Sequence, residues 1–320
     1  MEIKKSEITR WAAMGPRAAF GMAVLKLYEE EPDFFVMSAD LGSSSGLARF
    51  YSKYPDAFVN VGIAEQNLIG VAAGLAKDGT PVFATSFAPF ISMRASEQIR
   101  MNMGYMSLNI KAVGLGSGLA MNTLGASHFG LEDMAVMRTI PGMTVLCPSD
   151  GLQIAKCVEA SKHYDGPVYI RLSGGADIIY EDDFDYEIGK AIITKQGNDV
   201  AFIATGSIIS QTLKAADLLE EKGITCKVID MHTVKPLDKD ILNSLTEYKL
   251  IVTVEEHNIF GGLGSAVAEY YANRKERPRQ LMLGVNDFYP HPGKYEYLLN
   301  ECGLTPEKIS ERVMETYAEG

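Results

Sequence analysis

Glu65 is the residue whose surroundings most clearly suggest chemistry. It lies in residues 59–74, VNVGIAEQNLIGVAAG, where a short apolar run precedes a predicted helix made almost only of small or apolar residues. Such a helix must pack closely against a neighbour, so we expect Glu65 to be buried. An unpaired buried carboxylate is costly, so it should be protonated or hold a specific partner. A glutamate that only caps a helix is the alternative that this stretch leaves open.

Two phenylalanines and a histidine are further candidates. Phe87 and Phe90 flank Pro89 directly after a predicted strand. They could form a shelf for a planar ring, although core packing is the commoner role of such a pair. His128 lies in the loop GASHFGLED, outside any apolar periodicity. A histidine there can act as an acid or base or contact a phosphate, and a solvated surface histidine is equally compatible with the sequence.

The segment EEHNIFGGLGSAV, residues 255–267, places a glycine-rich turn before a predicted helix. Free amides at that helix N-terminus could bind an anion, and a tight strand-to-helix turn is the alternative. The glycines of GLGSG, residues 114–118, resemble a dinucleotide fingerprint only loosely and lack its spacing. The sequence contains no Walker-type loop, GxSxG elbow or HExxH motif.

Predicted strands and helices alternate along the chain. The predicted strands are 34–41, 81–87, 109–116, 143–149, 167–173, 199–206, 226–232, 249–256 and 280–285. The predicted helices are 16–31, the helix that begins at Glu65, 90–103, 151–164, 208–222, a helix near 238–246, and one from about 262 to 273. Apolar strands without strict alternation are typical of parallel sheets covered on both faces. Ligands of such sheets gather beyond the carboxyl ends of the strands, where polar clusters occur at 40–45, 85–90, 114–128 and 171–174.

The alternation is interrupted by residues 174–187, GGADIIYEDDFDYE, which suit an exposed connection between domains. We therefore expect a first domain over residues 1–174, a linker over 175–187 and a smaller α/β domain over 188–320. Two domains are usual for a chain of 320 residues.

The composition narrows the class of protein. A hydrophobic content of 47% with 22% charged residues is typical of soluble globular proteins, and no window has the apolar length of a membrane span. The N-terminal segment MEIKKSEITRW lacks the apolar core of a signal peptide, so we expect a cytoplasmic protein. The four cysteines are far apart, which favours a reduced compartment and no metal site. A net charge of −11 argues against nonspecific binding of nucleic acid.

Taken together, these segments resemble the transketolase family. NVGIAEQN, GVAAGLA, TSFAPFISMRASEQIR, GASHFGLEDMAVMRTIPGMTVLCPSD and DGPVYIRLS are similar to its pyrimidine-binding domain, and EEHNIFGGLGSAV is similar to its C-terminal domain. The resemblance covers nearly the whole chain, in order. It implies an α/β fold in which a thiamine-diphosphate-binding-type parallel-sheet domain precedes a smaller transketolase C-terminal domain.

The resemblance also implies an enzyme of two subunits. Transketolases bind thiamine diphosphate between two kinds of domain, one of which holds the diphosphate through Mg²⁺ with a GDG motif that this sequence lacks. We therefore expect the C-terminal subunit of a split transketolase, active only with an N-terminal subunit that carries the GDG motif and holds Mg²⁺. The chain should form dimers, and with its partner a heterotetramer.

The same resemblance assigns roles to single residues. Glu65 would bond N1′ of the cofactor's aminopyrimidine and so promote removal of the proton at the thiazolium C2 position. Phe87 and Phe90 would hold the aminopyrimidine ring, with Phe87 stacked on it. Asp40 and Ile63 would be further cofactor contacts.

Arg17 and Ser44 match positions near the terminal phosphate of the donor, and His128 matches a histidine of the acceptor channel. Three sugar-binding side chains of ordinary transketolases are replaced here: Gly116 stands for a histidine, Leu124 for an aspartate and Gly174 for an arginine. We therefore expect transfer of a two-carbon ketol unit from a branched, deoxy or otherwise altered ketose to an aldose acceptor. The terminal anion of that ketose can differ from phosphate.

Three alternatives stay open on the sequence. They are the β subunit of a 2-oxoacid dehydrogenase E1, an enzyme like deoxyxylulose-phosphate synthase, and a noncatalytic binding or regulatory protein on this fold. The segments GIAEQN, SFAPF and SMRASEQIR are closer to transketolases than to the first two. Retention of Glu65 and Phe87 speaks against the third.

Overall fold

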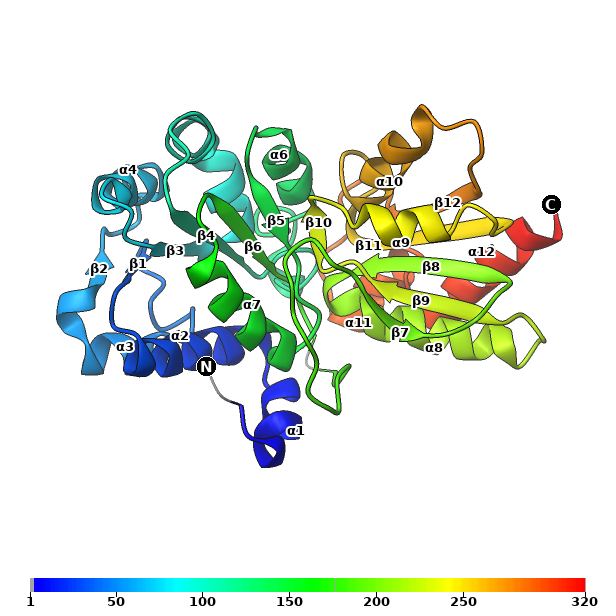
Figure 1. The fold of residues 1–320 in the computed structure, drawn as a ribbon, viewed down its shortest axis with the longest axis horizontal. Coiled ribbons are helices and arrows are strands. Elements are labelled where there is room, and N and C mark those ends of the chain that lie inside the picture. Colours follow the sequence, from blue (N-terminus) through cyan, green and yellow to red (C-terminus); the bar gives the residue numbers. More distant parts are fainter. Residues whose placement is uncertain (1–2, 176, 320) are drawn as a thin grey trace.

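The computed structural model describes residues 3–175 and 177–319 and contains two sheets, one built mainly by each half of the chain (Figure 1). The strands of the first sheet follow the order β10-β5-β6-β4-β3-β1-β2, and those of the second follow β12-β11-β8-β9-β7. This arrangement confirms the predicted fold class, an α/β protein with two parallel-sheet units.

Six parallel strands form most of the first sheet. They are β1 (Phe35–Ser38), β2 (Phe58–Asn60), β3 (Val82–Phe87), β4 (Ile110–Leu115), β5 (Thr144–Leu146) and β6 (Val168–Leu172). The helices of this half are α1 (Ile8–Ala12), α2 (Pro16–Glu30), α3 (Ala48–Lys53), α4 (Glu65–Ala76), α5 (Ser96–Ile99), α6 (Asp133–Thr139) and α7 (Gly151–His163). Helices α2 and α7 share one apolar core with the sheet, and α4 and α6 share a second core with it. Both faces of the sheet are therefore covered, as fully apolar strands require.

The second sheet consists of β7 (Ile192–Lys195), β8 (Val200–Thr205), β9 (Cys226–Asp230), β11 (Leu250–Asn258) and β12 (Arg279–Val285). Its helices are α8 (Ile209–Glu220), α9 (Lys239–Ser244), α10 (Leu263–Ala272), α11 (Tyr295–Glu301) and α12 (Pro306–Ala318). Only β7 runs antiparallel to its neighbour. Helices α8 and α12 pack on one face, and α9 and α10 on the other.

The structure differs from the predicted elements at several places. The predicted strand 226–232 ends at Asp230, and the chain continues as β10 (Thr233–Lys235), which pairs antiparallel with β5 of the first sheet. The predicted helix 90–103 is mostly π-helical, with α5 between Phe90–Arg94 and Arg100–Tyr105. Several elements were not predicted: strands β2 and β7 and helices α1, α3, α6, α11 and α12. The second half thus contributes a strand to the first sheet, which local sequence patterns cannot reveal because strand pairing is a long-range contact.

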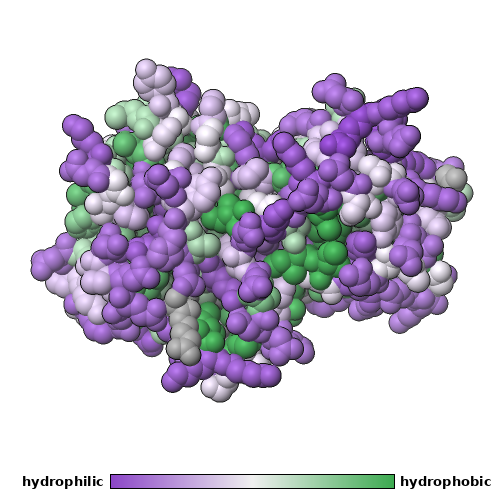
Figure 2. All heavy atoms as spheres, viewed as in Figure 1, coloured by the Kyte–Doolittle hydropathy of each residue, from purple (hydrophilic) through white to green (hydrophobic). Residues whose placement is uncertain are grey.

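The predicted linker, where the structure describes it, is exposed only in part. Its acidic residues face solvent, whereas Tyr180 is 8% exposed and its hydroxyl donates to Asp230 Oδ2 at 2.7 Å. Figure 2 shows a largely hydrophilic face with apolar side chains between polar ones near the middle of the molecule. Within the described residues, no helix has the length and apolar character needed to cross a membrane.

Candidate functional site

Glu65 begins helix α4 and is only 2% exposed, which confirms the predicted burial. The turn before it requires glycine at position 62, since Gly62 has a φ of +74°. Helix α4 packs on the sheet through Leu68 and Ala72. The expectation that all small residues of this helix pack against a neighbour is wrong for two glycines. Gly70 and Gly74 are exposed, with open space around them.

Two donors hold the Glu65 carboxyl. Arg94 Nη1 lies 2.9 Å from Oε2, and Ser86 Oγ donates to Oε1 at 3.3 Å. Ser86 lies near the end of β3, and Arg94 ends the π-helical segment Phe90–Arg94. The buried acid therefore has a specific partner, as the sequence led us to expect. Arg94 itself was not predicted, although its place four residues after Phe90 in a helical segment would have indicated that the two side chains are neighbours.

Phe87, Phe90 and His128 form an aromatic cluster next to this ion pair. The ring centroids are 5.9 Å apart for the two phenylalanines, 5.8 Å for Phe87 and His128, and 5.2 Å for Phe90 and His128. The guanidinium of Arg94 lies 4.3 Å from the Phe90 centroid. The structure thus brings together Glu65, both phenylalanines and His128, although they come from separate segments of the chain. Phe87, Phe90 and His128 are half-buried, so the phenylalanines are not core residues and the histidine is not simply solvated.

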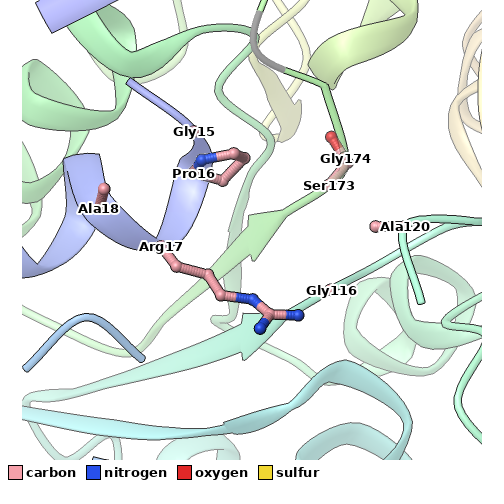
Figure 3. A pocket seen from close by; sticks show the side chains of 8 residues that line it. All are labelled: Gly15, Pro16, Arg17, Ala18, Gly116, Ala120, Ser173 and Gly174. Carbon is pink, nitrogen blue, oxygen red and sulfur yellow. The ribbon is translucent and has the colours of Figure 1, made fainter. Parts of the chain in front are cut away.

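Arg17 also lies beside Phe87, with its Cζ 5.8 Å from the centroid of that ring. Its Nη2 is 3.2 Å from the sulfur of Met121. The guanidinium reaches from α2 toward Gly116, and Ser173, Gly174 and Ala120 lie across from it (Figure 3). These residues line a cavity of about 350 Å³. The cavity therefore includes Arg17 and two of the three positions at which a polar family residue is replaced.

The small residue at position 116 matters for the shape of this cavity. A Cβ atom added to Gly116 would lie 2.5 Å from the sulfur of Met121, and Gly116 has a φ of +63°. A larger residue would therefore displace Met121 and strain the backbone. Among the described residues that line this cavity, Arg17 is the one that carries a charge.

Asp40 and Ser44 line a different cavity, of about 360 Å³. Asp40 is exposed with a φ of +60°, and Asn60 Oδ1 accepts a hydrogen bond from its backbone amide at 3.0 Å. Within the described contacts, neither Asp40 nor Ser44 touches the aromatic cluster. The neighbouring Ser45 is linked to the end of β3 by a 3.2 Å hydrogen bond between its hydroxyl and that of Thr85. Ile63, two residues before Glu65, is 78% exposed and so is available to a ligand or a partner chain.

The loop that carries His128 is held by the second half of the chain. Leu119 N donates to Glu256 Oε1 at 2.5 Å, and Tyr295 donates to the other oxygen of the same carboxyl at 2.5 Å. At the far end of the loop, the Tyr289 hydroxyl donates to Glu132 Oε1 at 2.6 Å. Burial raises the pKa of Glu256. Sequence reasoning missed these contacts, because they join residues that are distant in the chain, 137 positions apart for Leu119 and Glu256 and 157 for Tyr289 and Glu132.

Two amides at the start of α10 are bonded within the chain, which favours the tight strand-to-helix turn over the anion site that the sequence left open. Glu255 Oε2 accepts from Leu263 N at 2.7 Å, and its Oε1 accepts from Gly264 N at 2.8 Å. A Cβ at Gly262 would lie 1.9 Å from this carboxyl, so glycine is required there. Burial raises the pKa of Glu255 to about 7. The turn is therefore a tight strand-to-helix connection that carries its own carboxyl group.

Comparisons with known proteins match both halves of the chain. The family model of the transketolase pyrimidine-binding domain matches residues 12–176, and that of the transketolase C-terminal domain matches residues 189–309. A solved structure described as a split gene transketolase, an inactive β4 tetramer, is 38% identical with a TM-score of 0.86 and covers 95% of this chain and 98% of its own.

Three curated relatives have similar lengths. A putative transketolase C-terminal section of Methanocaldococcus jannaschii is 40% identical over 94% of this chain and 96% of its own. A 6-deoxy-6-sulfo-D-fructose transketolase subunit of a Clostridium species is 37% identical over 89% of each chain. One of the subunits of an apulose-4-phosphate transketolase of Phocaeicola vulgatus is 35% identical over 93% of this chain and 96% of its own.

The buried acid beside an aromatic cluster, the order of the two domains and these matches agree with one another. Members of this family depend on thiamine diphosphate and are transferases, and two relatives that match this chain over most of their length are named as subunits. This chain belongs to the transketolase family, as a transketolase-type transferase subunit that combines the pyrimidine-binding and C-terminal domains.

Proposed function

We propose that this chain, together with a second subunit, transfers a two-carbon ketol unit from an altered ketose to an aldose acceptor. The observation that carries the proposal is the buried Glu65 carboxyl beside the cluster of Phe87, Phe90 and His128. A carboxyl next to aromatic rings suits the aminopyrimidine of thiamine diphosphate, which is planar and has nitrogen atoms for hydrogen bonding.

The residues of this chain fit that cofactor. Arg94 and Ser86 occupy one acceptor position on each Glu65 oxygen, and a carboxylate has about four such positions. Glu65 would therefore still be able to bond N1′ and hold a proton there, and Phe87 and Phe90 would contact the ring. Bound thiamine diphosphate supplies an electron sink for breaking a carbon–carbon bond.

Asp40 and Ile63 are proposed as further cofactor contacts, since both are exposed at the ends of the strands beside the site. His128 is proposed to act on the acceptor, because its ring lies against Phe87 and Phe90 and is half-buried.

The diphosphate and Mg²⁺ are proposed to be held mainly by a partner subunit with a GDG motif. This sequence contains no GDG segment, and three relatives of similar length are named as a section or as subunits. The related structure is described as an inactive tetramer of one kind of subunit. We propose a heterotetramer of two copies of each subunit, located in the cytoplasm.

An altered sugar is proposed as the donor. Gly116 and Gly174 leave the cavity at Arg17 without the polar side chains that ordinary transketolases carry there, and Leu124 replaces a further one. Arg17 would bind the terminal anion. Ser44, which lines the other cavity, is proposed as a separate substrate contact. Two relatives are named for a sulfo-deoxy ketose and for apulose 4-phosphate, and both sugars depart from the usual pentose phosphates.

The test is reconstitution of this chain with the GDG-bearing partner, Mg²⁺ and thiamine diphosphate, followed by a screen of ketose donors. We expect ketol transfer from a variant ketose and poor use of xylulose 5-phosphate with ribose 5-phosphate. The Glu65→Gln variant should lose at least about 100-fold in deuterium exchange at the cofactor's C2 position, since removal of a catalytic group commonly costs that much. Its assembly, followed by sedimentation, should be unchanged.

Other outcomes would contradict this function. Release of CO₂ from pyruvate would indicate a synthase or dehydrogenase component, and full exchange at C2 in the Glu65→Gln variant would indicate that Glu65 is not the acid. A pair that assembles but binds no thiamine diphosphate would indicate a noncatalytic protein.

A further inference from the structure

We propose that Arg94 is a positioning residue of the reaction, which fixes the Glu65 carboxyl so that its free acceptor positions face the aminopyrimidine. This inference rests on the function proposed above. Arg94 ends a π-helical segment, a rare element that often occurs at functional sites.

The Arg94 guanidinium is held by two different contacts. Its Nη1 lies 2.9 Å from Glu65 Oε2, and its Cζ lies 4.3 Å from the centroid of Phe90. A guanidinium is planar, so contact with a ring and a bond to a carboxylate together fix its orientation. Arg94 therefore ties the acid to the aromatic cluster by direct contacts.

The carboxyl is fixed in turn. Ser86 donates to Oε1 and Arg94 to Oε2, so rotation of the carboxyl group would break both hydrogen bonds. The side chain of Glu65 is 2% exposed, and water cannot readily replace a lost donor there. Each oxygen keeps acceptor capacity for one further donor.

The ion pair of Arg94 and Glu65 differs from an ordinary surface ion pair. The side chain of Arg94 is 50% exposed, and such a residue usually gains little from pairing with an exposed acid. Here the acid is buried and is the group proposed to react. The matched comparison is Arg100 in the same region, whose side chain is 58% exposed and whose partner Glu97 is 62% exposed.

The test uses the reconstituted enzyme with Mg²⁺ and thiamine diphosphate, and compares Arg94→Gln, Arg94→Lys and the control Arg100→Gln. We expect Arg94→Gln to slow deuterium exchange at C2 by about 10- to 100-fold, because misplacement of a reacting group has effects of that size. Its kcat should fall while the KM of the donor stays within about threefold. Arg94→Lys should restore part of the rate, since it keeps the charge but not the planar group. Arg100→Gln should match the wild type.

Two readouts besides turnover complete the test: the Kd of thiamine diphosphate by calorimetry and the Tm of each variant. Measurements are made well below the lowest Tm, so that a loss of fold is not mistaken for a loss of function. A lowered Tm with unchanged C2 exchange would show a merely structural pair and would overturn the proposal. Tighter cofactor binding with undiminished exchange would show that Arg94 blocks the site, and would overturn it too.

The two proposals fail in different ways. If the wild-type pair binds no thiamine diphosphate, the function itself is wrong and the role of Arg94 falls with it. If the wild-type pair binds the cofactor and transfers ketol units, but Arg94→Gln equals wild type in every readout, only the role of Arg94 is wrong.

Discussion

The chemical environment of Glu65 is set by the residues around it. A glutamate at a helix start is ordinary, but this one is 2% exposed and accepts from Arg94 and Ser86. Phe87 and Phe90 stand beside it without being part of the closed core. The combination of a held acid and accessible rings is what separates a binding site for a planar ring from a structural ion pair.

The Phe87→Ala variant tests the ring-binding role at this scale. Loss of the aromatic face should weaken thiamine diphosphate binding by about 10-fold, because aromatic pairs contribute about 0.5–1.5 kcal/mol beyond the burial of their area. Calorimetry on the reconstituted enzyme measures the change in Kd. Phe288→Ala, at an aromatic residue of the second half that is 40% exposed, serves as the control and should leave Kd unchanged. Equal Kd values for Phe87→Ala and wild type would rule out the stacking role.

At the scale of elements, the loop between β4 and α6 depends on the second half of the chain. Glu256 on β11 accepts from the start of this loop, and Tyr289 donates to Glu132 at its end. His128 lies between these two attachments. The C-terminal half thereby holds in place a residue that lies beside the aromatic cluster, although none of its own residues belongs to that cluster.

Removing the hydroxyl of Tyr289 tests this dependence. We expect Tyr289→Phe to raise the KM of the acceptor several-fold, because the loop loses one of its attachments, while the Kd of thiamine diphosphate stays the same. Steady-state kinetics and calorimetry give the two values. Tyr270→Phe is the control, since the Tyr270 hydroxyl bonds to Lys239 and Asn243 within the second half. A change in cofactor affinity without a change in acceptor KM would contradict the assignment.

At the scale of the whole molecule, a buried polar cluster joins the two halves. Asp230 Oδ2 on β9 accepts from Ser149 at 2.9 Å, from Gln153 at 3.0 Å and from Tyr180 at 2.7 Å. Its Oδ1 is buried without a hydrogen-bond partner among the described residues. Burial raises the pKa of Asp230 to about 7 from an ordinary value of 3.8.

The raised pKa predicts how stability depends on pH. Between about pH 4 and 7 the folded state binds a proton at Asp230 that the unfolded state has lost, so this group makes the protein less stable as pH rises. Asp230→Asn removes the effect and keeps an oxygen for the three donors. The free energy of unfolding of the variant relative to wild type should therefore increase from pH 4 to pH 7, by at most about 1.4 kcal/mol for each unit of pKa shift.

Denaturant titrations at each pH measure this difference. Burial lowers the pKa of His232 to about 4, so His232 also makes stability depend on pH. This contribution is present in the variant and in the wild type, and it cancels in the difference between them. A difference that stays constant with pH would show that Asp230 is not protonated in the folded state.

Much of the molecule could be predicted from its sequence, because the relevant signals are local. Short apolar runs between helical segments determine a parallel sheet with both faces covered, and the turn before α4 together with its apolar residues determines that Glu65 is buried. The sequence also places Phe87 at the end of a strand, and Phe90 and His128 in the segments that follow strands of the same sheet, where side chains from different segments can meet.

Other features were decided only by the tertiary structure, because they depend on contacts between residues distant in the chain. Strand β10 leaves the second half to join the first sheet, and the loop of His128 is held by Glu256 and Tyr289. The glycine-rich turn before α10 proved to hold Glu255 instead of an external anion. Residue types and their spacing indicated that Glu65 is the acid that could react. Only the tertiary structure shows that Arg94 and Ser86 donate to it, because the donors of a buried carboxylate are those that the fold places within hydrogen-bond distance.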